Sequence, residues 1–448
     1  MRHLIRLIQK TYRMIDPGEA RRVMQNVLSL SGLQAITYIL PIIILPYLFR
    51  VLGPEKFGLI AFAQAFVQYF IILTDYGFNI TATKEISLCH SENNLKTNEV
   101  FSCVMIVKTI LAVASIGVLW GILHLIPKFH DDQMVYVLSF GVVLGSTLFP
   151  VWFFQGMESM QYIARLNVLG ELVYAFCIFF FVQQPQDYLM VPLITSSVSI
   201  GTGVLGQFFA FRNFKVAFAF PGWDNIWEQF KIGWNIFISV LAINAYTTTR
   251  VFAVGLMTNN TLTGFYSIAE RIAGAAQTFP LSSFTQAIFP RLSKIYHKSR
   301  QKAFEIMKQV QWITVIISLI CLPVLFAFSH EIIKLVCGKY YDEATVALRL
   351  LLISVFFVSA NAFRVQFLLV CGRTDIYSRI HVRMAVFAVP VIIGFIHWFS
   401  YSGAALATVL IEVSVFTATI VALRKLSFED VPPGPQDLKG HLGNSPAG

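Results

Sequence analysis

Apolar stretches of about 20 residues, separated by short polar segments, dominate the chain. A helix of that length spans the roughly 30 Å hydrocarbon core of a bilayer and satisfies its own backbone hydrogen bonds. The pattern predicts an all-α integral membrane protein with about twelve transmembrane helices, at residues 27–49, 57–79, 100–125, 134–155, 166–183, 189–211, 233–256, 262–289, 304–328, 349–371, 383–399 and 402–423.

The composition excludes a soluble protein. Of the 448 residues, 56% are hydrophobic and 13% are charged, whereas a soluble domain carries about 25% charged residues. The net charge of +10 would also suit a nucleic-acid binder, but such a protein needs basic residues on a water-exposed face. The chain offers almost no water-exposed domain, so we set nucleic acid aside and expect membrane lipids to meet the basic segments.

The basic residues predict how the helices are oriented. With twelve spans, twenty-three of the 34 Lys and Arg residues fall on the side of the N-terminus and six on the other side. The remaining five lie inside spans. Because short loops rich in Lys and Arg stay in the cytoplasm, both termini are predicted to be cytoplasmic.

Two similar halves are indicated by paired motifs. Gly58 and Gly264 follow similar loops and are 206 residues apart, while Gly156 and Gly372 are 216 apart. The offsets predict a duplicated six-helix unit with a pseudo-twofold axis along the membrane normal. The expected organisation is a cytoplasmic segment at 1–22, six-helix bundles at 23–212 and 233–424, an interfacial linker helix at 213–232, and a cytoplasmic, disordered tail at 425–448.

Ionisable and polar residues inside the spans are the candidate functional residues. A charge at a helix centre costs about 2.5–3.5 kcal/mol on insertion scales, so it normally faces a cavity or a partner. The cationic candidates for an anionic headgroup are Lys108, Arg250, Arg271 and Arg364. The candidates for ion coupling are Asp75, Glu171, Glu270 and Glu412, and the polar cavity candidates are Gln64, Gln68, Asn235, Tyr246 and Asn361.

Two interpretations of these residues stay open. Guanidinium groups match phosphate oxygens bidentately, which favours a cationic cavity that holds a diphosphate. Alternatively, four cations and four acids pair internally, although Glu270 and Arg271 are adjacent and lie about 100° apart on a helix. The acids would bind a coupling H⁺ or Na⁺ or serve as structural partners. The sequence carries no catalytic or metal-binding motif, so no cofactor is expected.

Several strings carry a more specific signal. They are Asn26, Gln34 and Pro41, PYLFRVLGPEKFG at 46–58, DYG at 75–77, ATKEIS at 82–87, WFFQGMESM at 152–160, GFYSIAERI at 264–272, AIFPRLS at 287–293 and CGKYY at 337–341. Together they resemble Wzx-type O-antigen flippases, in the polysaccharide transporter branch of the MOP exporter superfamily. The resemblance covers roughly residues 23 to 425 and does not extend to the tail after Arg424.

The resemblance implies that the chain moves undecaprenyl-diphosphate-linked repeat units from the cytoplasmic to the periplasmic leaflet of a bacterial inner membrane. It implies alternating access, a cationic cavity and ion antiport, with the strongest carry-over for Glu270 and Arg271. A polysaccharide polymerase and a chain-length regulator of the same pathway are candidate partners. The alternatives are a multidrug exporter of the same superfamily, which the arginines disfavour, and a membrane glycan polymerase or glycosyltransferase, which would need long periplasmic loops.

Overall fold

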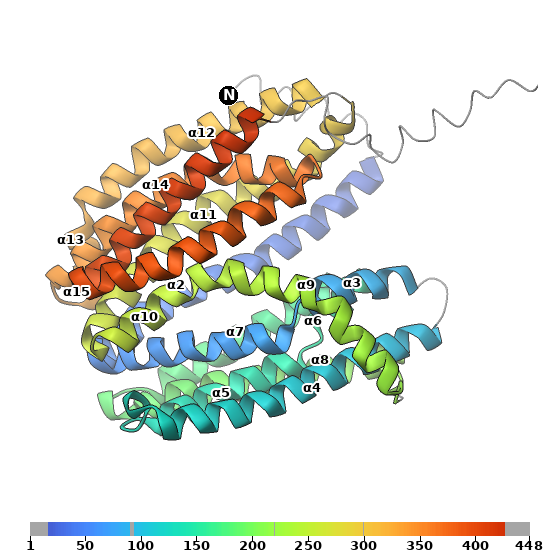
Figure 1. The fold of residues 1–448 in the computed structure, drawn as a ribbon, viewed down its shortest axis with the longest axis horizontal. Helices are drawn as coiled ribbons and strands as arrows, with labels where there is room; N and C mark the ends of the chain where they lie inside the picture. Colours follow the sequence, from blue (N-terminus) through green and yellow to red (C-terminus); the bar gives the residue numbers. More distant parts are fainter. Residues whose placement is uncertain (1–16, 90–93, 219, 299, 426–448) are drawn as a thin grey trace, which may run out of the picture. The chain divides into compact units, whose positions relative to one another are not determined.

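The computed structural model describes residues 17–89, 94–218, 220–298 and 300–425, and these residues form helices without a β-strand (Figure 1). The helices are α2 (Pro17–Asp75), α3 (Phe78–Cys89), α4 (Asn94–Leu125), η1 (Pro127–Phe129), α5 (Gln133–Leu148), α6 (Val151–Gly156), α7 (Met160–Phe181), η2 (Pro185–Leu189), α8 (Met190–Phe214), α9 (Trp223–Thr247), α10 (Thr249–Met257), α11 (Asn260–Lys298), α12 (Arg300–Ala327), α13 (Ser329–Cys337), α14 (Asp342–Val370) and α15 (Thr374–Lys425).

The all-helical membrane prediction is confirmed. Within the described residues, eight helical stretches are long and apolar enough to cross a membrane: Ile39–Cys89, Leu95–Leu125, Gln133–Gly156, Met160–Phe181, Pro185–Phe214, Arg300–Ala327, Asp342–Val370 and Asp375–Arg424. The first and last contain backbone kinks, at Gly53 and Ser400, where the sequence pattern predicts a boundary between two spans. The total of twelve crossings and the cytoplasmic location of the termini stay predictions.

Three predicted spans are interrupted. The span predicted at 57–79 breaks after Asp75, where Tyr76 and Gly77 adopt positive φ angles of 45° and 81°. The span predicted at 134–155 breaks after Leu148, because Pro150 lacks a backbone N–H and its ring obstructs the preceding turn. The span predicted at 233–256 is divided at Thr248, between α9 and α10, although the Thr248 N–H still donates to the Asn244 carbonyl oxygen over 2.9 Å. Thr247, Thr248 and Thr249 form a run of β-branched residues, which disfavours a regular helix.

The segment expected to form a separate linker helix at 213–232 is organised differently. Helix α8 ends at Phe214, and Lys215 adopts a left-handed conformation that terminates it. Helix α9 begins at Trp223 and continues without interruption to Thr247. Trp223 and Trp227 are exposed, as a membrane-interface anchor requires.

The chain forms two compact units. Unit 1 contains the described residues up to Tyr47 and Leu73–Trp234, and unit 2 contains Leu48–Ile72 and the described residues from Asn235 onward. The change of unit near residue 234 lies close to the predicted division between halves. The middle of α2, residues 48–72, groups with unit 2, although the sequence pattern places it in the first bundle.

Small residues allow close helix packing in unit 1, where α5 packs against α8. Gly141 and Gly145 lie four residues apart on α5, and a Cβ on Gly141 would come within 2.5 Å of the Ser196 Cβ. Gly203 of α8 faces the Gly145 carbonyl oxygen, which would lie 2.7 Å from an added Cβ. Membrane helices use such glycine pairs because lipid gives apolar side chains little reason to associate.

In unit 2, helix α14 packs against α11, α12 and α15 (Figure 1). The middle of α2 joins this unit through a close crossing with α11. A Cβ on Gly58 would overlap the Asn260 carbonyl oxygen and lie 2.5 Å from the Gly264 nitrogen, and a Cβ on Gly264 would overlap the Pro54 carbonyl oxygen. Neither glycine can carry a side chain without moving a backbone, so this crossing fixes the register of the two helices.

Candidate functional site

A polar cleft of about 230 Å³ lies in unit 2, a little more than one helical turn from the glycine crossing. Three segments contribute to it: the middle of α2, the break between α9 and α10, and α11. Its lining residues are Ala61, Gln64, Ala65, Gln68, Thr247, Thr248, Val251, Ser267, Glu270 and Arg271. The structure therefore brings together four residues that the sequence singled out: Gln64, Gln68, Glu270 and Arg271.

The lining of the polar cleft repeats with the offset of 206 that separates Gly58 from Gly264. The offset pairs Ala61 with Ser267, Gln64 with Glu270 and Ala65 with Arg271, and all six residues line the cleft. Equivalent faces of α2 and α11 thus meet around one cavity. The α2 copies are neutral, whereas the α11 copies include an acid and a base.

Arg271 is exposed in the polar cleft and makes two contacts with α2. Its Nη2 donates a hydrogen bond of 2.7 Å to Oε1 of Gln64. Its guanidinium carbon lies 5.4 Å from the centroid of the Phe57 ring, within the range of a cation–π interaction. Both of these contacts are with neutral groups of α2, and the guanidinium also interacts electrostatically with Glu270.

Glu270 forms an ion pair with a second arginine, Arg250. Its Oε1 lies 3.4 Å from Nε of Arg250, and both side chains are largely buried. Nε of Arg250 also donates to the Thr247 carbonyl oxygen over 3.3 Å, and Nη1 donates to the Thr408 hydroxyl over 3.5 Å. Glu270 also interacts electrostatically with its sequence neighbour Arg271, so this acid has two arginine partners.

Two further predicted residues lie near Arg250. Glu412 of α15 and Tyr246 of α9 both interact with it electrostatically. Arg250 is therefore the centre of a cluster to which four helices contribute, with Glu270 on α11. Two carboxylates surround this guanidinium, and one of them, Glu270, also interacts with Arg271. Among the described residues, no group of three or more His, Cys, Asp or Glu side chains could hold a metal ion.

Lys108 and Asp75 pair with each other in unit 1. Nζ of Lys108 lies 3.0 Å from Oδ1 of Asp75 and donates a second bond of 3.0 Å to the Ser146 carbonyl oxygen. The Lys108 side chain is 2% exposed, whereas that of Asp75 is 30% exposed. This placement matches the internal-pairing interpretation, and Lys108 is not among the residues that line the polar cleft.

The remaining candidates lie elsewhere. Arg364 donates to the Ala360 carbonyl oxygen, and its guanidinium carbon is 5.1 Å from the centroid of the Phe416 ring. Asn361 is buried and donates to the Thr419 hydroxyl over 3.3 Å. Glu171 is partly buried on α7 of unit 1. The side chain of Asn235 lies outside the residues whose side chains are described.

Threonines complete the site, although they were not among the candidate residues that the sequence indicated. Thr247 and Thr248 line the polar cleft, and Thr408 contacts Arg250. The run Thr247–Thr249 inside an otherwise apolar span was the available signal, because three consecutive hydroxyl residues are unusual in a helix that faces lipid. Thr408 carries no comparable signal, since its hydroxyl also bonds the Ala404 carbonyl of its own helix.

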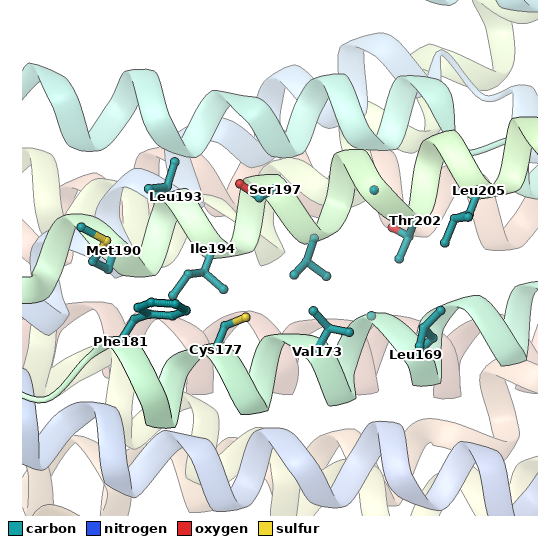
Figure 2. Close-up of a pocket in the computed structure, with 13 residues that line it drawn as sticks. Leu169, Val173, Cys177, Phe181, Met190, Leu193, Ile194, Ser197, Thr202 and Leu205 are labelled. Atoms are coloured by element: carbon teal, nitrogen blue, oxygen red, sulfur yellow. The ribbon is translucent and has the colours of Figure 1, made fainter.

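An apolar pocket of about 480 Å³ lies between α7 and α8 in unit 1. Figure 2 shows Leu169 and Val173 of α7 facing Ile194 and Leu205 of α8 across it. Its lining has hydroxyl groups at Ser197 and Thr202 but contains no ionisable carboxylate, amine or guanidinium. This pocket suits hydrocarbon, and the polar cleft is where charged chemistry is available.

Comparison with known sequences points to one family. Residues 23–296 match the family model described as "Polysaccharide biosynthesis protein". A protein of Escherichia coli (strain K12) named "Putative O-antigen transporter" is 27% identical over 409 residues, which cover 89% of this chain and 96% of the relative. A protein of Shigella dysenteriae with the same name is 24% identical over 406 residues, covering 89% of this chain and 100% of the relative.

Solved structures share the fold. The inward closed conformation of the lipid II flippase MurJ matches with a TM-score of 0.73 at 11% identity, covering 90% of this chain and 89% of that one. The inward-facing conformation of a multidrug resistance MATE family transporter of the MOP superfamily matches with a TM-score of 0.69 at 14% identity, covering 87% and 92%. At these identities the likeness concerns the fold alone.

Proposed function

Because the chain belongs to the polysaccharide biosynthesis protein family, we propose that it is a transporter that flips a lipid-linked polysaccharide precursor across a bacterial inner membrane. The names of the two relatives support the view that the precursor belongs to the synthesis of O-antigen or a similar surface polysaccharide. The substrate proposed here is an oligosaccharide repeat unit on undecaprenyl diphosphate, moved from the cytoplasmic to the periplasmic leaflet. A polymerase and a chain-length regulator would act on the product.

The observation that carries this proposal is the exposed Arg271 in a polar cleft of a membrane protein. A guanidinium exposed between membrane helices is costly unless it meets an anion or water. A diphosphate offers oxygens that match its planar donors. Amides and hydroxyls of Gln64, Gln68, Thr247 and Thr248 line the same cleft, and such groups are suited to sugar hydroxyls.

The cluster around Arg250 supports ion coupling. Glu270 and Glu412 both interact with this one guanidinium, and Glu270 also interacts with Arg271, so an anion that binds Arg271 would leave two acids around one arginine. A buried excess charge is expensive in a membrane, and uptake of one H⁺ or Na⁺ would neutralise it. Arg250 thus has a different role from Arg271: it holds the acids, while Arg271 meets the substrate. Alternating access would link the two events.

The test of the function is the location of the lipid-linked glycan. In a strain without this protein and without related transporters, repeat units on undecaprenyl diphosphate should accumulate in the cytoplasmic leaflet, detected by their protection from a periplasmic glycosidase or ligase. Normal delivery to the periplasm would refute the flippase proposal. Export of cationic drugs that depends on the protein, with unchanged glycan delivery, would assign it instead to multidrug export.

The test of the site uses arginine substitutions. Arg271→Ala and Arg250→Ala should abolish glycan delivery while membrane insertion is retained, measured by the amount of protein in the membrane fraction. Arg383→Ala is the matched control, because Arg383 is an exposed arginine of unit 2 outside the cleft lining. Equal loss in all three variants would contradict the assignment of the site.

A further inference from the structure

We propose that an anion bound at Arg271 makes Glu412 take up a proton, and that Glu270 and Arg250 link the two events. The inference rests on the proposed function and deepens it, because it names the coupling ion, the acid that receives it and the reason the anion triggers its uptake. All four residues belong to unit 2.

The four side chains form a series of alternating charge. Glu270 interacts with both Arg271 and Arg250, and Arg250 interacts with both Glu270 and Glu412. In the order Arg271, Glu270, Arg250, Glu412 the formal charges sum to zero. Each inner member is shared by two neighbours, so a new charge at one end of the series changes the balance at the other end.

Geometry shows which of the two acids is held more tightly. Oε1 of Glu270 lies 3.4 Å from Nε of Arg250, and both side chains are largely buried. Glu412 interacts with the same guanidinium at longer range, because no cation lies within ion-pair distance of it among the described residues. Glu412 is therefore the acid that a proton neutralises with the smaller loss of ion pairing.

An anion at Arg271 upsets the neutral series. It competes with Glu270 for the Arg271 guanidinium, so Glu270 relies more fully on Arg250. Two carboxylates then share one guanidinium in a largely buried place, which is costly. A proton from water that adds to a carboxylate oxygen of Glu412 removes the excess charge.

The coupling has a sign. Because linkage is reciprocal, a proton on Glu412 also strengthens the binding of an anion at Arg271. The anion and the proton are thus bound together at this cluster and are not exchanged for one another. This differs from the antiport that the resemblance to O-antigen flippases implies.

A proton suits this cluster better than Na⁺ does. A hard metal cation needs several oxygen ligands, whereas a proton adds to a single carboxylate oxygen. Arg250, with which both acids interact, also repels a second cation. Exchange of Na⁺ for K⁺ at constant pH should therefore leave anion affinity unchanged.

Other ionisable groups near Glu412 determine the controls. They are Tyr246 of α9, Tyr266 of α11, His381 of α15 and, on the neighbouring α14, Arg364. Phenols ordinarily titrate near pH 10 and arginine stays charged, whereas an imidazole ordinarily titrates near pH 6.5. The ring of His381 lies 6.5 Å from that of Tyr246, so His381 is the competing proton acceptor.

Calorimetry of the purified full-length protein counts the protons. The anions are inorganic pyrophosphate, as the free source, and undecaprenyl diphosphate in lipid nanodiscs, as the lipid source. Titration in buffers of different ionisation enthalpy, between about pH 5 and pH 9, gives the protons taken up per anion bound. The unmodified protein should take up about one more than the Glu412→Gln variant, because the protons of the anion itself are common to both.

Equal proton counts in the unmodified protein and in Glu412→Gln at every pH would overturn the proposal. An extra proton with the lipid and no binding of pyrophosphate would support it and identify the lipid as the source. An extra proton with both anions would support it for the diphosphate group as such. Anion affinity that depends on Na⁺ and not on pH would refute proton coupling.

The Glu270→Gln variant tests the link. Arg271 then no longer shares this acid, so diphosphate affinity should rise by about threefold or more, and the proton count should fall to that of Glu412→Gln. Tighter binding cannot result from misfolding. Weaker binding, or a proton count like that of the unmodified protein, would contradict the role of Glu270.

Two control variants separate Glu412 from its surroundings. Glu305→Gln makes the same chemical change at an exposed acid of α12 in unit 2, and it should keep the extra proton. His381→Gln should keep it as well. Loss of the extra proton in His381→Gln, at an unchanged melting temperature, would assign the proton to His381 and overturn the proposal.

The coupling and the flippase function fail in different ways. If Glu412→Gln takes up as many protons as the unmodified protein, yet glycan delivery requires the protein, only the coupling is wrong. If the proton counts are as expected, but cells without the protein deliver glycan normally, only the flippase function is wrong.

Discussion

Gly58 and Gly264 pack backbone against backbone, and each faces the carbonyl oxygen of the residue four positions before the other. Gly58 faces Asn260, and Gly264 faces Pro54. The contact is reciprocal between positions that are 206 residues apart, which is the relation that a local twofold axis generates. The repeat offset noticed in the sequence therefore corresponds to a physical contact. The same offset relates the residues that line the polar cleft a few positions further along both helices.

Substituting either glycine should damage the protein. In a Gly58→Ala variant, the added methyl would overlap the Asn260 carbonyl, so α2 and α11 must separate. We expect a loss of about 1–3 kcal/mol of stability and a loss of glycan delivery, because the cleft depends on this register. Gly274→Ala on α11 is the control, since open space surrounds that position. Equal melting temperatures for the two variants would contradict the packing described.

The ion pair between Lys108 and Asp75 predicts an asymmetric response. Asp75→Asn leaves the Lys108 ammonium without its counter-charge at a site where it is 2% exposed, so we expect a loss of about 3–5 kcal/mol. Lys108→Met should cost less, because Asp75 is 30% exposed and reaches water. Unfolding of the purified variants would measure both. The exposed Lys96, on the same helix α4, provides a neutral control as Lys96→Ala.

A double variant tests whether this pair acts as a unit. Asp75→Asn combined with Lys108→Met removes both charges, and it should be more stable than Asp75→Asn alone, because no unpaired charge stays buried. Strictly additive losses would show that the two residues contribute independently.

Arg364 and Arg271 should respond differently to lysine. Arg271 depends on a planar fork held between Gln64 and Phe57, so Arg271→Lys should reduce diphosphate affinity several-fold. Arg364 lies over Phe416 and bonds a carbonyl of its own helix, and it is absent from the cleft lining. Arg364→Lys should therefore leave affinity within about twofold. A larger effect from Arg364→Lys would restore it to the ligand-binding set that the sequence suggested.

Helix α13 offers a test of how the protein is oriented in the membrane. Burial raises the pKa of Cys337 to about 12, so its thiol should hardly react with a maleimide at pH 8, where the reactive thiolate is scarce. Leu335, two residues earlier, is 73% exposed. A Leu335→Cys variant without the native cysteines should react rapidly with a membrane-impermeant maleimide added outside the inner membrane. Labelling only from the cytoplasmic side would reverse the predicted topology.

The sequence by itself determined the helices and many of the positions where they end or kink. Segments such as 166–183 and 349–371 are apolar for long enough that a membrane leaves no alternative to helix, and the kinks at Gly53 and Ser400 lie where the apolar pattern pauses. Local rules also predicted that Glu270 needs a partner besides Arg271, since adjacent residues on a helix point in different directions, and Arg250 is that partner. The breaks at Pro150 and Thr248 are equally local, because a proline and a run of three threonines mark them in the sequence.

The tertiary structure alone decided which charges meet. Lys108 could have faced a cavity with the arginines, but folding places it against Asp75, 33 positions away. Arg271 bonds Gln64 across 207 positions, and Arg250 lies among Glu270, Glu412 and Tyr246 from three other helices. Periodicity shows which face of a helix is polar but not which helix lies opposite. That choice depends on close packing at points such as Gly58 and Gly264, where the absence of a side chain lets two backbones touch.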